Sequence, residues 1–221
     1  MSSSPRVTDT LAERAVERAV ADKRAELAAG MERIVEATYE LIEQTGDVDP
    51  SMRMILAHLG LSTQAFYRHF RSKDELMLAV LDDGRRRLVG HLERRLERAR
   101  SPEGKVRAWV EGILAQASDP RAAARTKPFV VSEDRLAEAF PSEHAASVEQ
   151  LVALVVPPLE ELARGRSPSR RDPGRVWADA RAVYRLTFAT LRDALLAGQE
   201  PTRAAVDHLV AFVLGGVGAV G

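Results

Sequence analysis

The sequence of 221 residues lacks cysteine, and its 32 basic residues are balanced by 32 acidic ones. Without cysteine, disulfide bonds, thiolate nucleophiles and cysteine-based zinc sites are excluded. No run of about 18 uncharged apolar residues occurs and the N-terminus lacks the apolar core of a signal peptide, so we expect a soluble, cytoplasmic protein with no membrane partner. Because the net charge is zero, contact with a nucleic acid needs a local cluster of basic side chains.

Motifs of catalysis and cofactor binding are also missing. The sequence has no Gly-x-Ser-x-Gly, no phosphate-binding loop, no His-Glu-x-x-His, and no Gly-x-Gly-x-x-Gly after a predicted strand. Its histidines are isolated from one another: His58, His69, His91, His144 and His208. We therefore expect no enzymatic activity, no metal site and no cofactor.

The most informative stretch covers residues 51–76, in which cap and turn residues separate helical segments. We predict helices over about 51–59 and about 63–70, with another helix directly after them. Gly60 can adopt the left-handed conformation that ends the first helix, and the Ser62 hydroxyl can cap the second. Two helices joined by so short a turn form a helix-turn-helix.

Two local side-chain pairs support these boundaries. Leu61 and Phe66 have the spacing of a hydrophobic staple across the start of the second helix. Ser72 and Glu75 have the spacing of a capping box at the start of the next one.

The second helix of this stretch has two unlike faces. Phe66 and Phe70 fall on one side, where we expect core. Gln64, Tyr67 and Arg68 fall on the other, and no acidic residue occurs over 50–73. Amide, phenol and guanidinium groups on one exposed face suit a helix in the major groove of DNA, and the alternative is an ordinary solvated face.

Together these segments resemble the DNA-binding domain of TetR-type transcriptional regulators over about residues 31–80. The matching residues are Ser51, Gly60-Leu61-Ser62, Tyr67-Arg68-His69-Phe70 and Ser72-Lys73-Asp74-Glu75-Leu76. Met54, Leu56 and Gln64 depart from the family pattern.

The resemblance implies contacts with a double-stranded DNA operator. Tyr67, His69 and Lys73 are the expected phosphate contacts, and Thr63, Gln64 and Arg68 are the expected base contacts. Ser51 and Arg53 complete the predicted DNA-binding set.

The predicted fold class is all-α, with an N-terminal three-helix helix-turn-helix domain and a larger C-terminal helical domain for ligand binding and dimerisation. Its predicted parts are an N-terminal helical extension over 1–30, the DNA-binding domain over 31–76 and the effector-binding and dimerisation domain over 77–221. The extension either approaches DNA or is a solvated helix, since its charges cancel. The basic segment 164–174 is predicted to be a surface loop.

Aromatic side chains with a few polar neighbours occur over about residues 102–195, a mixture that suits a small-molecule pocket or plain core. The candidate ligand-binding residues are Trp109, Ile113, Phe129, Arg135, His144, Trp177, Tyr184 and Phe188. That this domain holds an effector is implied by the resemblance, and the effector's identity is open.

The last two predicted helices, over 175–197 and from 201 onward, carry more apolar surface than one helix face needs. The candidate dimerisation residues are Leu191, Leu195, Leu209, Phe212 and Val213. The alternative is that they are internal core. The resemblance implies a four-helix bundle with the same pair of helices from a second subunit, and a twofold dimer matches a palindromic operator.

These predictions describe a homodimeric transcriptional regulator, in this family most often a repressor, which a small-molecule effector releases from its operator. The helix over 72–98 connects the two predicted domains and is a candidate lever between them. Two alternatives stay open: a constitutive DNA-binding protein without an effector, and a helical small-molecule-binding protein.

Overall fold

The computed structural model describes residues 10–47, 49–164 and 172–217. Every regular element in those ranges is a helix, which confirms the all-α prediction. Most of the predicted loop over 164–174 and the first nine residues of the predicted extension lie outside them. Within the described ranges, no helix combines the length and apolar character needed to cross a bilayer.

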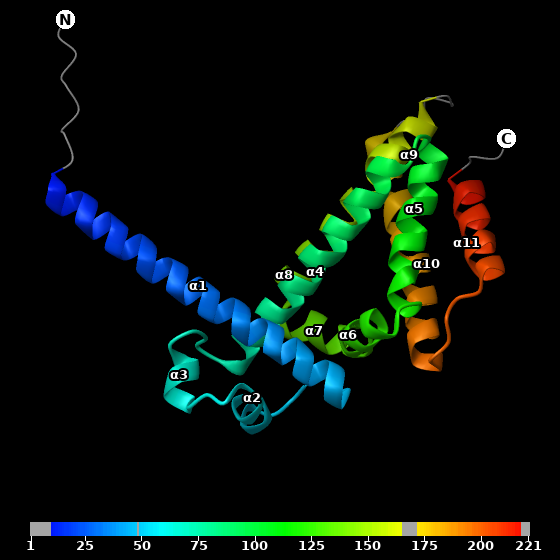
Figure 1. Cartoon of the computed structure of the whole chain (residues 1–221). Helices are drawn as coiled ribbons and strands as arrows, with labels where there is room; N and C mark the ends of the chain where they lie inside the picture. Colours follow the sequence, from blue (N-terminus) through cyan, green and yellow to red (C-terminus); the bar gives the residue numbers. More distant parts are fainter. Residues whose placement is uncertain (1–9, 48, 165–171, 218–221) are drawn as a thin grey trace, which may run out of the picture.

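The helices follow one another in two groups, which Figure 1 shows joined by the long helix α4. Their bounds are α1 Leu11–Thr45, α2 Met52–Leu59, α3 Thr63–Tyr67, α4 Lys73–Arg98, α5 Pro102–Leu114, the short 3-10 helix η1 Ala115–Ala117, α6 Pro120–Val131, α7 Glu133–Ala139, α8 Pro141–Ala153, α9 Val156–Ala163, α10 Pro173–Ala197 and α11 Arg203–Gly216.

Helix α1 runs without a break across the boundary at residues 30 and 31 that was predicted between the extension and the DNA-binding domain. It starts at a capping box, in which the Thr10 hydroxyl accepts from the Glu13 amide at 3.2 Å, and it ends at Gly46 in the left-handed conformation. The helix continues through Gly30. The His69 imidazole packs on this glycine so closely that a Cβ atom there would overlap the ring. The N-terminal half of α1 projects beyond the rest of the molecule (Figure 1).

The helix-turn-helix follows the predicted caps. The Ser51 hydroxyl accepts from the Met54 amide and the Ser62 hydroxyl accepts from the Ala65 amide, at 3.3 Å and 3.1 Å. Gly60 ends α2 with φ at 61°. Helix α3 stops at Tyr67, earlier than predicted, so Phe70 lies in the turn that follows it.

The start of α4 contains half of the predicted capping box. The Ser72 hydroxyl accepts from the Glu75 amide at 3.0 Å, as expected. The Glu75 carboxylate accepts from the Arg71 amide at 2.5 Å instead of the Ser72 amide. The Glu75 carboxylate therefore stabilises the turn before the cap as well as the start of the helix.

Two apolar cores lie at the two ends of α4. Leu76, Met77 and Val80 join the core of α1, α2 and α3. Leu92 joins the second core, which surrounds α5 and includes the fully buried Trp109. Because α4 contributes to both cores, its position fixes one group of helices against the other.

Residues 141–163 form two successive helices. Helix α8 ends at Ala153, and Pro157 and Pro158 occupy the first turn of the new helix α9. Proline is tolerated there because the first amides of a helix have no intrahelical acceptor.

Helix α1 packs against α4 through a buried phenol. The Tyr39 hydroxyl donates to the Val80 carbonyl at 2.5 Å, and its ring meets Phe129 of α6 edge-on with centroids 5.8 Å apart. A Cβ atom at Gly84 would overlap the same hydroxyl. The glycine is therefore required for the close approach of α1 and α4.

We expect Gly84→Ala to lower the free energy of unfolding, although alanine favours a helix by about 1 kcal/mol over glycine. In a Tyr39→Phe chain the obstructing oxygen is gone, so the same substitution should raise the free energy of unfolding by up to about 1 kcal/mol. Urea denaturation of the four chains measures both effects. An effect of the same sign in both backgrounds would contradict this packing.

Candidate nucleic-acid interface

The outward face of α3 is set by two buried phenylalanines. Phe66 and Phe70 are 0% and 1% exposed, with ring centroids 5.8 Å apart. The Tyr67 ring meets Phe66 edge-on at 5.5 Å and remains 55% exposed. Anchored in this way, α3 presents its opposite face to solvent.

The predicted base-contacting residues share that solvent-exposed face. Thr63, Gln64 and Arg68 are all exposed, and Ser51 and Arg53 are exposed at the start of α2. Their groups are hydroxyl, amide and guanidinium, which can donate to base edges or to phosphate oxygens. Five of the predicted DNA-binding residues are thus exposed in the helix-turn-helix, with Tyr67 as a sixth.

His69 differs from the expected phosphate contact. Its side chain is half-buried against Gly30 of α1, and its Nδ1 is buried without a hydrogen-bond partner among the described residues. The imidazole therefore contributes to the packing of α1 on the helix-turn-helix. Sequence spacing gave no sign of this contact, because the two residues are far apart in the chain.

Lys73 also has a partner within the protein, because its ammonium group pairs with Asp49. Its Nζ lies 2.5 Å from Oδ1 of Asp49 and 3.4 Å from the Asp49 carbonyl oxygen. The other carboxylate oxygen of Asp49 accepts from Nη1 of Arg135 in α7 at 2.7 Å. One carboxylate thus joins the start of α4 to the second group of helices.

Arg135 was predicted to bind a ligand, and the structure gives it this bridging contact instead. Hydrogen bonds from Arg135 and Lys73 lower the pKa of Asp49 to about 2. The carboxylate is therefore ionised throughout the neutral range, and the Lys73–Asp49–Arg135 bridge is charged on both sides.

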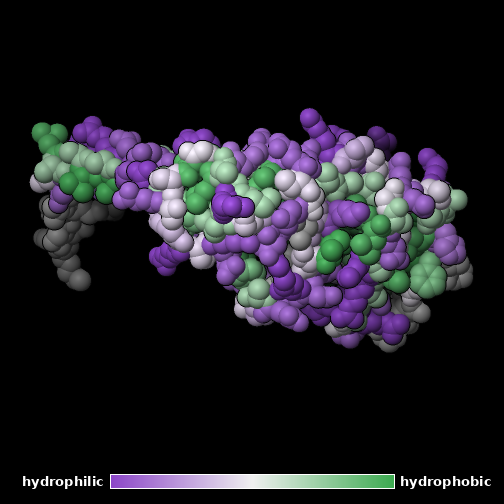
Figure 2. Space-filling view, turned by 90° about the horizontal axis from the view of Figure 1, so that it is seen from below, coloured by the Kyte–Doolittle hydropathy of each residue, from purple (hydrophilic) through white to green (hydrophobic). Residues whose placement is uncertain are grey.

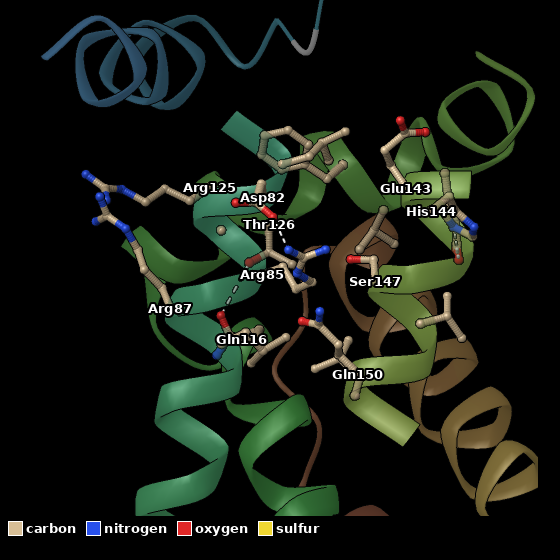
Figure 3. Close-up of a pocket in the computed structure, with 18 of the residues that line it drawn as sticks. Asp82, Arg85, Arg87, Gln116, Arg125, Thr126, Glu143, His144, Ser147 and Gln150 are labelled. Carbon is tan, nitrogen blue, oxygen red and sulfur yellow. Dashed lines mark hydrogen bonds and ion pairs between the residues drawn. The ribbon is translucent and has the colours of Figure 1, made fainter. Parts of the chain in front are cut away.

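A cavity of about 850 Å³ lies in the second group of helices, bordered by α4, α6, α8 and α10 (Figure 3). Phe129, His144, Tyr184 and Phe188, four of the predicted ligand-binding residues, line it. Its volume is in the range typical of small-molecule sites.

The other predicted ligand-binding residues lie elsewhere. Trp109 and Ile113 are fully buried in the core around α5, where the Trp109 indole N–H donates to the Leu151 carbonyl at 3.1 Å. Trp177 is outside the cavity wall and packs below the Arg181 guanidinium at 5.7 Å. Their spacing on helices did not distinguish a cavity wall from a core.

Sequence reasoning missed the α4 side of the cavity. The polar residues there include Asp82, Arg85, His91 and Arg94. Asp82 and Arg85 lie three residues apart, but Asp82 and His91 lie nine residues apart, which is half a turn out of phase on a helix. No single period therefore marked these residues in the sequence, and the arginines of this segment are equally consistent with a solvated face.

The predicted dimerisation residues differ in how much of each is exposed to solvent. Leu191, Leu195 and Val213 are at most 3% exposed and belong to the core of their own chain, and Leu209 packs against it. Phe212 is 60% exposed. Leu186 and Leu196 of α10 are also exposed, at 40% and 51%, and were not predicted.

Comparison with known proteins identifies the family that this helix-turn-helix resembles. Residues 34–80 match the model of bacterial regulatory proteins of the tetR family. The fold is similar to Salmonella enterica GusR, with a TM-score of 0.63 and 19% identity over 84% of this chain and 93% of that one. A search among curated proteins gives no match.

Two further solved structures share the fold. The transcriptional regulator SCO7518 from Streptomyces coelicolor A3(2) has a TM-score of 0.57 and 20% identity over 82% of this chain and 96% of that one. A transcriptional regulator of the TerR/AcrR family from Aquifex aeolicus VF5 has a TM-score of 0.51 and 20% identity over 86% and 99%.

We expect Gln64→Ala and Arg68→Ala each to weaken binding to a duplex selected by this protein by about 1–3 kcal/mol and to relax base preference at one position. Fluorescence anisotropy at fixed salt measures the change. Arg164→Ala is the matched control, since Arg164 is exposed at the end of α9, far from α3 (Figure 1). Equal losses for all three variants would contradict the assignment.

The Lys73–Asp49–Arg135 bridge can be tested with Asp49→Asn, by measuring how the free energy of unfolding depends on pH. The pKa of Asp49 is about 2 in the folded chain and about 3.9 in an unfolded one, so its carboxylate stabilises the fold fully above about pH 4. That contribution is lost as the pH falls from about 4 to about 2. The free energy of unfolding of Asp49→Asn should therefore be below that of the parent at pH 6, and the difference should close in that acidic window.

Urea denaturation at a series of pH values makes this measurement. Glu40→Gln is the control, because Glu40 is exposed on α1 and should show a smaller effect. A deficit for Asp49→Asn that stays constant down to pH values near 2 would show that the bridge does not act through charge.

Proposed function

We propose that the chain is a repressor of the TetR family of transcriptional regulators, which binds a palindromic operator as a homodimer and is released by a small-molecule effector. The match of residues 34–80 to the model of that family supports the proposal. The observation that carries the proposal is the burial of Phe66 and Phe70, which leaves the amide, phenol and guanidinium groups of α3 exposed. No acidic residue over 50–73 opposes the approach of DNA to this face.

In this proposal α3 enters the major groove. Thr63, Gln64 and Arg68 contact base edges, and Tyr67 contacts the backbone beside them. Ser51 and Arg53 at the start of α2 contact phosphates on the flank of the groove. Backbone contacts would set the register of the protein, and the base contacts would select the operator.

A second copy of the chain would cover the outer face of α10 and α11. The exposed Leu186, Leu196 and Phe212 lie on these helices, among small residues such as Ala189 and Ala211. Figure 2 shows apolar surface at the end of the molecule where these helices lie. The buried Leu191, Leu195 and Val213 belong to the core in which both helices pack against α5.

Release by an effector would use the contacts between the cavity and the helix-turn-helix. Glu133 of α7 lies 3.5 Å from His144 on the cavity wall, and Arg135 of the same helix holds Asp49. An effector that moved α7 would act on the Lys73–Asp49–Arg135 bridge at the start of α4. The shift in operator affinity equals the difference in effector affinity between the two conformations.

A direct test selects bound sites from random duplexes. We expect a palindrome whose half-sites are one or more helical turns apart, about 10 base pairs each. Enrichment of no sequence, or of a single half-site without symmetry, would contradict a dimer that reads DNA through two copies of α3.

The dimer has its own test in Phe212→Glu. A buried carboxylate at each copy of this position should dissociate the dimer, so sedimentation should give a monomer and affinity for the palindrome should fall. Val16→Glu is the control, because Val16 is 62% exposed on the projecting part of α1 against 60% for Phe212. A Phe212→Glu chain that sediments as the parent dimer would overturn this choice of interface.

A further inference from the structure

The α4 side of the cavity contains two buried polar atoms that lack a hydrogen-bond partner among the described residues. They are Nε of Arg85 and Nε2 of His91. Both residues line the cavity, and only 16% of the Arg85 side chain is exposed. A buried donor without a partner costs about 1–3 kcal/mol, so such groups usually face a bound molecule or water.

The charge around Arg85 is not fully balanced. Another nitrogen of its guanidinium pairs with Asp82, but Asp82 also pairs with Nε of Arg86 at 3.2 Å. The ion-pair cluster that extends from here along α4 to α1 and α6 contains five arginines and four carboxylates, namely Arg85, Arg86, Arg87, Arg121 and Arg125 with Asp82, Asp83, Glu36 and Glu43. The cluster thus has one more cation than anions, and its most exposed cations are Arg86 and Arg121, at 68% and 89%.

A further cation lies on the same wall. Arg94 lines the cavity and has no ion-pair partner in the part of the chain that the structure describes. Burial and the nearby Arg95 and Arg94 lower the pKa of His91, so its imidazole is neutral near pH 7 and can donate from Nε2 in one tautomer.

The wall of the cavity opposite α4 carries neutral polar groups at the level of Arg85. Figure 3 shows the Arg85 guanidinium extending from α4 toward α8, where Ser147 and Gln150 point toward it. The acidic Glu143 lies in another part of the cavity, next to His144. His144 in turn pairs with Glu133 at 3.5 Å.

The remaining lining is largely apolar. Its members include Leu81, Leu88, Phe129, Phe140, Tyr184 and Phe188. The Tyr184 and Phe188 rings lie 4.3 Å apart and form one continuous aromatic surface. A molecule that fills the cavity of about 850 Å³ must therefore bury mostly hydrocarbon or aromatic surface.

We propose that this cavity binds an apolar carboxylic acid, with the carboxylate held by Arg85 and His91 and the apolar part packed against Phe129, Tyr184 and Phe188. The proposal rests on the proposed function, since it names the chemical class of the effector. Arginine suits the role because its planar group stays charged when buried and donates in the geometry of a carboxylate. A neutral apolar ligand would leave the Nε donor of Arg85 without a partner.

The test uses 11-(dansylamino)undecanoate, whose dansyl fluorescence rises in an apolar site, and its neutral methyl ester. In titrations of the full chain we expect the acid to bind at least about 10-fold more tightly than the ester, as a charge-assisted hydrogen bond requires. Arg85→Gln should weaken binding of the acid by about 10- to 100-fold and leave binding of the ester unchanged.

Arg86→Gln is the matched control, because Arg86 shares Asp82 with Arg85 but is 68% exposed and does not line the cavity. It should leave both affinities unchanged. Should Arg85→Gln fail to fold, competition in the parent chain replaces it: decanoate should displace the dye at lower concentration than decanol.

Three results would overturn the proposal: equal affinities for acid and ester, equal losses for both in Arg85→Gln, or no binding of either. Release of a selected operator is measured separately. An ester that binds best and releases the operator would refute the ligand class but leave effector release intact. An acid that binds through Arg85 without changing operator affinity would support the ligand class and refute release.

Discussion

The arrangement of this protein depends on the burial of two phenylalanines beneath a helix of five residues. So short a helix has almost no stability of its own in water. Phe66 and Phe70 stabilise α3 because they pack into the same core as Leu76 and Val80 of α4. The face presented by α3, with Tyr67 exposed on it, is thereby fixed to the helix that leads into the second group of helices.

Helix α4 is the common element of the two cores, and the contacts beside it are largely electrostatic. The carboxylate of Asp49 holds Lys73 at the start of α4 and Arg135 in α7 at the same time. In this conformation the Lys73 ammonium is paired with Asp49, and 25% of the side chain is exposed. A movement of α7 would break the contact between Asp49 and Arg135 and leave Lys73 paired with Asp49.

The local features of the helix-turn-helix could be predicted because their causes lie within a few residues of one another. A left-handed Gly60 and a capping Ser62 need no information about the rest of the chain. The pairing of Lys73 with Asp49 could not be predicted, since both are polar residues near a turn and only the tertiary fold brings them together. Arg85 was indistinguishable from its solvated neighbours for the same reason, because burial depends on α8 lying across α4.

The central claim is that the exposed side of α3 meets DNA. Photo-crosslinking tests it most directly, with p-benzoylphenylalanine incorporated in place of Tyr67 and, as a reference, in place of Tyr184 on the cavity wall. With a selected duplex, the chain altered at Tyr67 should crosslink to bases or sugars of the half-site, and the chain altered at Tyr184 should not. Crosslinking at neither position, in a chain that still binds the duplex, would contradict the account.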